Sequence, residues 1–245
     1  MATRNLIEAF DLPPGRRIAN RYEIQNKIGD GYEGEVYRIR ELRTGIERAA
    51  KFFFPHRNPA DKTSKFYAKK LHKLRQCPIL IQYHAEEEIV FHKTPITVLI
   101  SEYVEGVMLE QFVAAAPGRR LNPFMGLHLL YALVRGVEQI HLMNEYHGDL
   151  HVQNIIVTHF GMEFGLKLLD FYNWSSYPSS ECRRDDLVST IEIFYECIGG
   201  RRHYAKLPKA VKDICCGMNH TRILKKFKNV SALRKYLETV TWLEV

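Results

Sequence analysis

The strongest constraint on the fold is a change in the pattern of the sequence near residues 102–106. Before this point, short runs of β-branched and aromatic residues alternate with Gly, Pro and charged residues, which is typical of strands and turns. After it, apolar residues recur three and four positions apart, as they do on one face of a helix. A chain of 245 residues with this pattern is expected to form a small β-rich N-terminal lobe, a hinge and a helical C-terminal lobe.

The pattern also predicts the individual elements. In the N-terminal lobe we expect one helix over 62–75, and strands over 22–29, 35–42, 48–54, 86–92 and 96–104. In the C-terminal lobe we expect a hairpin of strands over 154–159 and 165–171, and helices over 121–143, 185–198, 207–218 and 229–239. Residues 1–20 are expected to be an extension with a short helix before a Pro-Pro-Gly break. The domain then covers 21–245, with lobes over 21–104 and 105–245.

Composition narrows the class of protein. Hydrophobic residues make up 46% and charged residues 26% of the chain, which is ordinary for a globular protein. No apolar run reaches the roughly 20 residues needed to cross a bilayer, and the first residues lack a signal-peptide core. We therefore expect a cytoplasmic protein without a membrane partner. The five cysteines lack zinc-ligand spacing, so we expect reduced and mostly buried thiols.

The net charge of +7 is concentrated in two basic segments, 61–75 and 201–236. Such runs are usually solvated faces, and the functional alternative is a partner that is acidic or carries phosphate. A nucleic-acid partner is disfavoured, because these segments lack interleaved aromatic residues on a strand where bases would stack. The sequence does not predict an oligomeric state.

A glycine motif occupies the sequence IGDGYEGEVY, where Gly29, Gly31 and Gly34 form G-x-G-x-x-G and Val36 follows. Glycines let backbone amides approach phosphates closely, but they also form ordinary hairpins. A Walker loop needs a trailing Lys-Ser/Thr, and a dinucleotide-binding motif needs a following helix. Here the following residues EVYRIREL predict a strand, so a glycine hairpin lying over phosphates is the better interpretation.

A single lysine, Lys51, lies within the apolar run RAAKFFF. A charge in an apolar strand must be paired or solvated. One interpretation is a cation that binds nucleotide phosphates, and the other is a lysine on an edge strand whose side chain reaches solvent.

The segment YHGDLHVQNII places Asp149 five positions before Asn154, and Asp170 follows sixteen positions later. The gap fits one hairpin, which would bring Asp170 beside Asn154. A carboxylate and an amide oxygen together suit Mg²⁺, which takes few protein ligands and completes its shell with phosphates and water. Asp149 is then the candidate catalytic base, or the carboxylate that orients an acceptor hydroxyl.

Taken together, these motifs resemble those of the protein-kinase-like superfamily from about residue 20 to 240. The resemblance implies an α+β, bilobal protein-kinase-like fold, with ATP in a cleft between a β-rich N-lobe and a helical C-lobe. It implies Mg²⁺-dependent phosphoryl transfer, in which positioning and electrostatics do most of the work. The residues implied to bind the nucleotide are Ile28, Gly29, Gly31, Gly34, Val36, Lys51, Glu102 and Val104, with Ser101 at the position before the hinge.

The resemblance also assigns roles in the C-lobe. Asp149 is the implied base, with Lys51 and His151 assisting at the phosphates, and Asn154 and Asp170 are the implied metal ligands. Asp186, at the start of a central helix, is expected to brace the catalytic loop through its backbone.

Several positions depart from the common protein-kinase pattern. Gly148 replaces the arginine that receives a regulatory phosphate, and His151 replaces a lysine, as in kinases of small molecules. The D-F-G motif reads Asp170-Phe171-Tyr172, and the segment before Asp186 is short, which argues against ordinary peptide docking. The helix over 62–75 has no glutamate to pair with Lys51.

By spacing, the missing glutamate falls at Tyr67 or Ala68. Neither can form an ion pair with Lys51, so we expect Asp170 or a carboxylate within 86–88 to substitute. Loss of the glutamate should reduce the rate, on the order of 10²-fold.

The favoured function is an ATP- and Mg²⁺-dependent Ser/Thr protein kinase with a truncated activation segment. The C-lobe is small, so a protein acceptor is favoured, and the basic segments make an acidic protein the first choice. One alternative is a pseudokinase that acts as a binding or regulatory module. Another is a small-molecule kinase similar to aminoglycoside phosphotransferases, which the H-G-D-L-H sequence of the loop favours.

Overall fold

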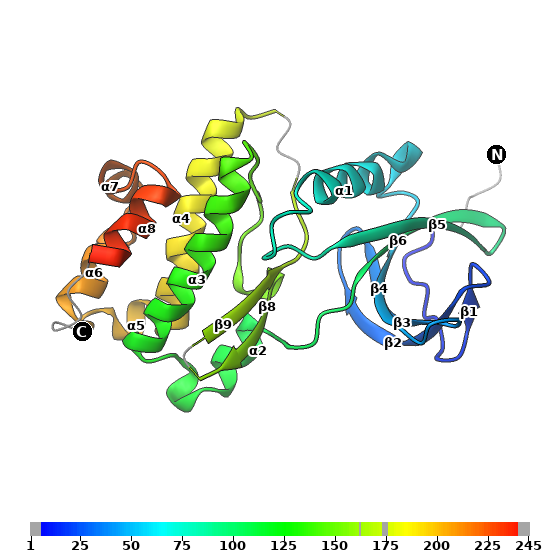
Figure 1. The fold of residues 1–245 in the computed structure, drawn as a ribbon, viewed down its shortest axis with the longest axis horizontal. Helices are drawn as coiled ribbons and strands as arrows, with labels where there is room; N and C mark the ends of the chain where they lie inside the picture. The colour runs from blue at the N-terminus through cyan, green and yellow to red at the C-terminus, as the bar shows by residue number, and fades with distance from the viewer. Residues whose placement is uncertain (1–5, 162, 173–175, 240–245) are drawn as a thin grey trace. The chain divides into compact units, whose positions relative to one another are not determined.

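The computed structural model describes residues 6–161, 163–172 and 176–239. The chain forms two compact units (Figure 1). The first consists of Met1–Gln76 and Ile81–Val104, and the second of Cys77–Leu80 and Glu105–Val245. A β-rich first unit and a helical second unit agree with the fold class expected from the sequence.

The first unit is built on one sheet of six strands in the order β1-β2-β3-β4-β6-β5, and all neighbours are antiparallel. The strands are β1 (Arg17–Ile18), β2 (Tyr22–Asp30), β3 (Gly34–Glu41), β4 (Glu47–Phe53), β5 (Tyr83–Phe91) and β6 (Thr94–Glu102). The alternation of β-branched and aromatic residues predicted all of these except β1, which has two residues. β4 lies between β3 and β6, so Lys51 is on a central strand and its interpretation as an edge-strand lysine is wrong.

The segment before β1 packs into the core of the first unit. Phe10 is 3% exposed, and its ring contacts those of Phe52, Phe54 and Phe91. Leu12 is also buried, and its backbone N donates to the hydroxyl of Tyr37. The predicted short helix is wrong for the described part of 1–20, which contains no helix. Asp11, between these two residues, has φ +44°, so the chain turns there and is not extended, and both neighbouring apolar side chains are buried.

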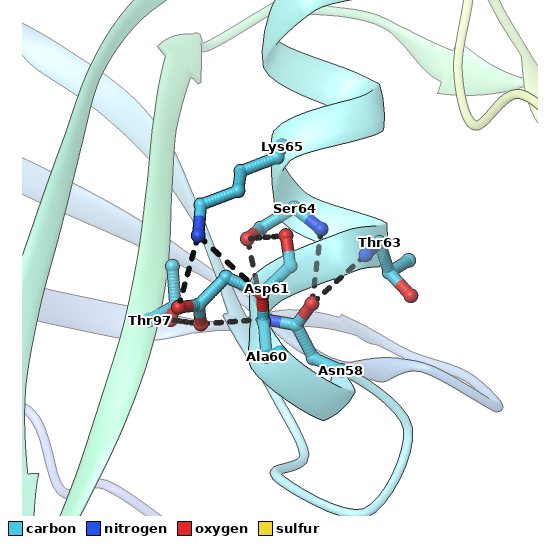
Figure 2. Close-up of polar contacts among 7 residues, drawn as sticks. All are labelled: Asn58, Ala60, Asp61, Thr63, Ser64, Lys65 and Thr97. Carbon is cyan, nitrogen blue, oxygen red and sulfur yellow. Dashed lines mark hydrogen bonds and ion pairs between the residues drawn. The ribbon is translucent and has the colours of Figure 1, made fainter.

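Among its described residues, the first unit has one α-helix, α1 (Lys62–Lys73), and the start of this helix is fixed by side chains (Figure 2). Asn58 Oδ1 accepts from the backbone N of Thr63 at 3.0 Å and of Ser64 at 3.1 Å, which satisfies two donors of the first turn. Thr97 of β6 donates to Asp61 Oδ1 at 2.6 Å. The helix is therefore attached to the sheet at its N-terminal end.

The second unit contains seven α-helices among its described residues, together with short 3₁₀ turns. They are α2 (Leu109–Ala115), α3 (Pro123–Leu142), α4 (Ser179–Cys197), α5 (Gly200–Tyr204), α6 (Lys209–Cys215), α7 (His220–Lys226) and α8 (Val230–Thr239). A small sheet has the order β7-β8-β9, from β7 (Val107–Met108), β8 (Ile155–Phe160) and β9 (Glu163–Leu168). The long helices α3 and α4 lie side by side, and α8 also packs on α3 (Figure 1).

The connection 77–80 belongs to the second unit because it packs against α3. A Cβ at Gly136 would lie 1.9 Å from Cδ1 of Ile79, so the helix needs a glycine there. Leu168 N also donates to Ile79 O at 2.7 Å, next to the bridge between Leu80 and Leu168.

The main differences from the predicted elements are in the second unit. α4 begins at Ser179, six residues before the predicted start at 185. The helices α2, α5 and α7 were not predicted, because five to seven residues are too few for a clear helical period. All five cysteines are free, and all except the partly exposed Cys216 are buried, as predicted. Among the residues that the structure covers, no helix has the length and apolar character of a membrane span.

Candidate active site

The glycine motif forms the hairpin between β2 and β3. Gly31 N donates to Gly34 O at 3.0 Å across the turn. A Cβ at Gly34 would lie 1.9 Å from the carbonyl oxygen of Phe52, whereas a Cβ at Gly31 would meet nothing within 4 Å and one at Gly29 only Val36, at 3.9 Å. Packing within the chain therefore requires glycine at 34 alone. The glycines at 29 and 31 leave the backbone open to approach from outside, as the expected phosphate contacts need.

Three of the expected nucleotide-binding residues form one row across the sheet. Gly29 is opposite Val36, and Val36 is opposite Lys51. Directly opposed residues of neighbouring strands have their side chains on the same face. The Lys51 side chain and the base of the glycine hairpin therefore share one face of the sheet.

Lys51 is nearly buried, with 13% of its side chain exposed, and its ammonium forms an ion pair with Glu33 at 2.8 Å. The same ammonium lies 4.5 Å from the ring centroid of Tyr67 on α1. The substitute acids expected from the sequence were Asp170 or a carboxylate within 86–88. The latter are on β5, which β6 separates from β4. Glu33 is not among the partners expected from the sequence, although it is adjacent to the third glycine of the motif.

The residues expected at the hinge lie at the C-terminal end of the first unit. Ser101 is buried on β6 opposite Ala49 of β4. Glu102 is the last residue of β6, and its carboxylate accepts from the backbone N of Gln82 at 3.1 Å. Val104 is the last residue of the unit. Ile28, on β2 before the first glycine, is 43% exposed.

The expected catalytic loop, residues 143–154, connects α3 to β8, and Asp186 of α4 braces its backbone as predicted. Asp186 Oδ2 accepts from His147 N at 2.7 Å and lies 3.0 Å from His141 Nε2, while Oδ1 accepts from Gly148 N at 2.8 Å. Gly148 has φ +86°, in the left-handed region that favours glycine. The position that carries arginine in many kinases therefore has a backbone conformation in this chain that a larger residue adopts only with strain.

Asp186 remains ionised because its hydrogen bonds outweigh its burial. Burial by itself raises the pKa of the Asp186 carboxyl. The hydrogen bond and charge of His141 and the N–H of Gly148 lower this pKa by more than burial raises it, so the net shift is downward. The brace is therefore a carboxylate that accepts from three donors.

Asp149, Asn154 and His151 lie together on the loop. Asn154 Nδ2 donates to both the carboxylate Oδ2 and the backbone O of Asp149, each at 2.9 Å. His151 Nε2 is 3.6 Å from Asp149 Oδ2, and His151 Nδ1 accepts from the backbone N of Gln153. Because Nδ1 accepts, the proton of a neutral ring is on Nε2, beside the carboxylate. About half of the Asp149 side chain is exposed (46%), so it is open to an acceptor.

The hairpin of β8 and β9 places Asp170 after the strand that pairs with the end of the loop. Ile155 is opposite Leu168, and Leu169 N donates to Asn154 O at 2.8 Å. Asp170 follows with φ +38°, uncommon for a residue other than glycine. Phe171 is then buried against the ring of His147, with 4.9 Å between the centroids.

The donor set fits Mg²⁺ better than a metal held by protein alone. Among residues 6–161, 163–172 and 176–239, no group of three or more His, Cys, Asp or Glu side chains could hold a metal ion. Asn154 and Asp170 offer one amide oxygen and one carboxylate. A site with so few protein ligands matches an ion that is held largely by phosphates and water.

The segment after Asp170 is short. α4 begins at Ser179, so only residues 171–178 separate the two. The part of the predicted activation segment over 173–175 lies outside the described residues.

Comparison with known proteins agrees with this geometry. A family model described as the protein kinase domain matches residues 22–195. Serine/threonine-protein kinase PrkC of Bacillus subtilis is 28% identical over 161 residues, 64% of this chain and 23% of that protein. CBL-interacting protein kinase 21 of rice (Oryza sativa) is 30% identical over 179 residues, 72% of this chain and 32% of that protein. This chain therefore spans less than a third of the length of either relative. These matches confirm the resemblance predicted from the motifs.

Proposed function

This chain belongs to the protein kinase domain family, and on that premise we propose that it transfers the γ-phosphate of ATP to a Ser or Thr hydroxyl of a protein. The observation that carries the proposal is the catalytic loop. There the Asp149 carboxylate is held by Asn154, and Asp186 fixes the backbone before it. Phosphoryl transfer depends mainly on such positioning.

The roles of the residues follow from their contacts. Asp149 accepts the proton of the acceptor hydroxyl and orients its oxygen. Lys51 holds the phosphates of ATP, beside the open backbone of Gly29 and Gly31. Asn154 and Asp170 would hold Mg²⁺, which neutralises charge on the phosphates when bound.

His151 supplies a donor next to the base. Its Nε2 lies 3.6 Å from Asp149 Oδ2, just beyond hydrogen-bond distance. When ATP is bound, the Nε2–H can donate to the phosphate, where many protein kinases use a lysine.

A protein acceptor is supported by the names of the two relatives described above, a serine/threonine-protein kinase and a CBL-interacting protein kinase. Residues 171–178 leave little chain for the usual peptide platform before α4. We propose that an acidic acceptor is recruited by the basic residues of the second unit instead. Nine of these are exposed within 201–236: Arg201, Arg202, Lys206, Lys209, Arg222, Lys225, Lys226, Lys228 and Lys235.

A second candidate is a nucleotide-binding protein without catalysis. The observation that favours it is α1, whose twelve residues KTSKFYAKKLHK contain no acid to pair with Lys51. Tyr172 in place of the D-F-G glycine points the same way.

The test is transfer of labelled γ-phosphate from ATP with Mg²⁺, to the chain itself, to a basic protein and to an acidic protein. We expect wild type and Asp213→Asn to transfer label, and Asp149→Asn to transfer none. Asp213→Asn is the matched control, because it makes the same change at an exposed acid on α6. The labelled amino acid distinguishes Ser and Thr from Tyr.

Equal transfer by Asp149→Asn and wild type would refute the role of the base. If no protein transfers label but Mg·ADP raises the melting temperature of wild type and not of Asp170→Asn, the second candidate is correct. If Mg·ADP also has no effect on wild type, both candidates are refuted.

A further inference from the structure

The ammonium of Lys51 lies beside an acid of the glycine hairpin, Glu33, and beside two aromatic rings, Tyr67 of α1 and Phe53 of β4, the latter with its centroid at 5.4 Å. Glu33 Oε2 lies 2.8 Å from Nζ, and the centroid of the Tyr67 ring lies 4.5 Å from it. A cation within about 6 Å of an aromatic face is attracted by the negative charge density of the ring. Tyr67 is one of the two positions, with Ala68, at which the family pattern predicts glutamate, and its ring contacts the same cation that the missing acid would contact.

Tyr67 and Glu33 differ in how firmly the structure holds their side chains. Tyr67 of α1 is 5% exposed, and its ring contacts that of Phe53 on β4. The first turn of α1 donates to Asn58, and Asp61 connects its start to Thr97 of β6 (Figure 2). Glu33 is on the turn of the glycine hairpin, and 26% of its side chain is exposed. Its backbone O accepts from Phe54 N at 2.9 Å, so the backbone is fixed while the carboxylate can rotate away.

Glu33 therefore forms an ion pair with the same ammonium, that of Lys51, to which the nucleotide phosphates are proposed to bind. The carboxylate comes from the same hairpin whose open glycines are proposed to contact those phosphates. Two anions at one ammonium repel each other and compete for its three donors.

We propose that Glu33 is an internal competitor of the nucleotide phosphates at Lys51, and that Tyr67 is the positioning residue that stays in contact with Lys51 when Glu33 is displaced. This inference rests on the proposed function, because it takes a nucleoside phosphate as the ligand. Without nucleotide, Glu33 neutralises Lys51 and keeps its side chain ordered. With nucleotide, the phosphates replace the carboxylate, and the ring holds the ammonium in place of a helix glutamate.

The first test measures binding of Mg·ADP and of adenosine by calorimetry to wild type, Glu33→Gln and Asp30→Asn. Exposed and partly exposed ion pairs are worth little, so removal of the competitor should tighten Mg·ADP binding about two- to fivefold. Adenosine has no phosphates, so its affinity should not change. Asp30→Asn is the matched control: it removes the same charge from the same hairpin, but its partner is Lys27 at 3.0 Å.

The second test concerns the ring. Tyr67→Phe keeps an aromatic face and should keep the Mg·ADP affinity of wild type, whereas Tyr67→Leu should weaken it about three- to tenfold. Adenosine affinity should be equal in both variants, which separates loss of the cation contact from a disturbed fold. Glu33→Gln changes no core residue, so the first test holds even if Tyr67→Leu is unstable.

The outcomes separate this inference from the proposed function. If wild type binds Mg·ADP but Glu33→Gln binds it equally or more weakly, the competition is refuted and nucleotide binding stands. If Asp30→Asn tightens binding as much as Glu33→Gln, the effect is one of general charge, and the competition is again refuted. If Tyr67→Leu binds like Tyr67→Phe, the positioning role is refuted. Wild type that binds neither ligand refutes nucleotide binding itself, and this inference with it.

Discussion

The brace of the catalytic loop gives the sharpest prediction, because one carboxylate satisfies three donors. In Asp186→Asn, one of the two oxygens becomes an NH₂ group, which can only donate. In the better orientation, the amide oxygen takes the place of Oδ2 and keeps the hydrogen bonds from His147 N and His141 Nε2. The NH₂ group then faces the backbone N–H of Gly148, whose acceptor was Oδ1 at 2.8 Å.

The expected cost follows from these contacts. Leaving the N–H of Gly148 without an acceptor costs about 1–3 kcal/mol, and the two retained hydrogen bonds lose their charged acceptor, at about 0.5–1 kcal/mol each. Asp186→Asn should therefore lower the free energy of unfolding by about 2–5 kcal/mol. The backbone before Asp149 should also shift, and phosphoryl transfer should fall by about 10²-fold.

Urea denaturation at neutral pH measures the stability. The matched control is Asp185→Asn, which makes the same change at the preceding, exposed position of α4 and should stay within about 0.5 kcal/mol of wild type. Equal unfolding midpoints for the two variants would refute the reasoning.

The pH dependence has a definite sign. The pKa of the Asp186 carboxyl is lowered in the folded chain from its ordinary value of 3.8. A depressed carboxyl stabilises the fold fully above the unfolded pKa and loses this contribution as the pH falls through the folded pKa. The stability difference between wild type and Asp186→Asn should therefore be constant down to about pH 5 and then narrow. A difference that grows on acidification would contradict the prediction.

Three further predictions concern the first unit. Gly34→Ala should lower the free energy of unfolding by more than about 2 kcal/mol in thermal denaturation, because the new Cβ would lie 1.9 Å from a backbone oxygen. Gly31→Ala should stay within about 0.5 kcal/mol of wild type, because a Cβ there meets nothing within 4 Å. Phe10→Ala should cost about 3–5 kcal/mol in urea denaturation, because the buried ring contacts three others. Glu35→Gln should cost about 1–3 kcal/mol at neutral pH. Burial raises the pKa of Glu35, but hydrogen bonds from Tyr37 and Lys27 lower it more, so denaturation at several pH values should show this difference shrinking below about pH 4.5.

The part of the site that could be predicted from the sequence is the part that depends on local spacing. Five positions from Asp149 to Asn154 fit one turn of a loop, and sixteen from Asn154 to Asp170 fit one hairpin. The structure has that hairpin, and the backbone N of Leu169, the residue before Asp170, donates a hydrogen bond to Asn154 O. The brace by Asp186 was also predicted, but only through the resemblance, since no spacing rule connects residues so far apart.

The partner of Lys51 could not be predicted in the same way. Strand periodicity gives the face of a side chain, but Glu33 is in a turn, where periodicity gives no direction. The register of β3 on β4 and the hydrogen bond from Phe54 to Glu33 bring the turn beside the end of β4. This register results from the packing of the whole sheet. The predicted helix before residue 20 failed for a similar reason, because burial of Phe10 against rings from β4 and β5 outweighs local preference.

The packing of Phe10 and Leu12 also separates the physical edge of the first unit from the edge of the family pattern, which begins at residue 22. Recombinant protein trimmed to that homology boundary would lose both side chains and would expose the apolar surface of Phe52, Phe54 and Phe91 that Phe10 covers. An exposed apolar patch next to sheet edges favours aggregation. A chain that starts before Phe10 should therefore be soluble where the trimmed one is not, although both contain every residue assigned to catalysis.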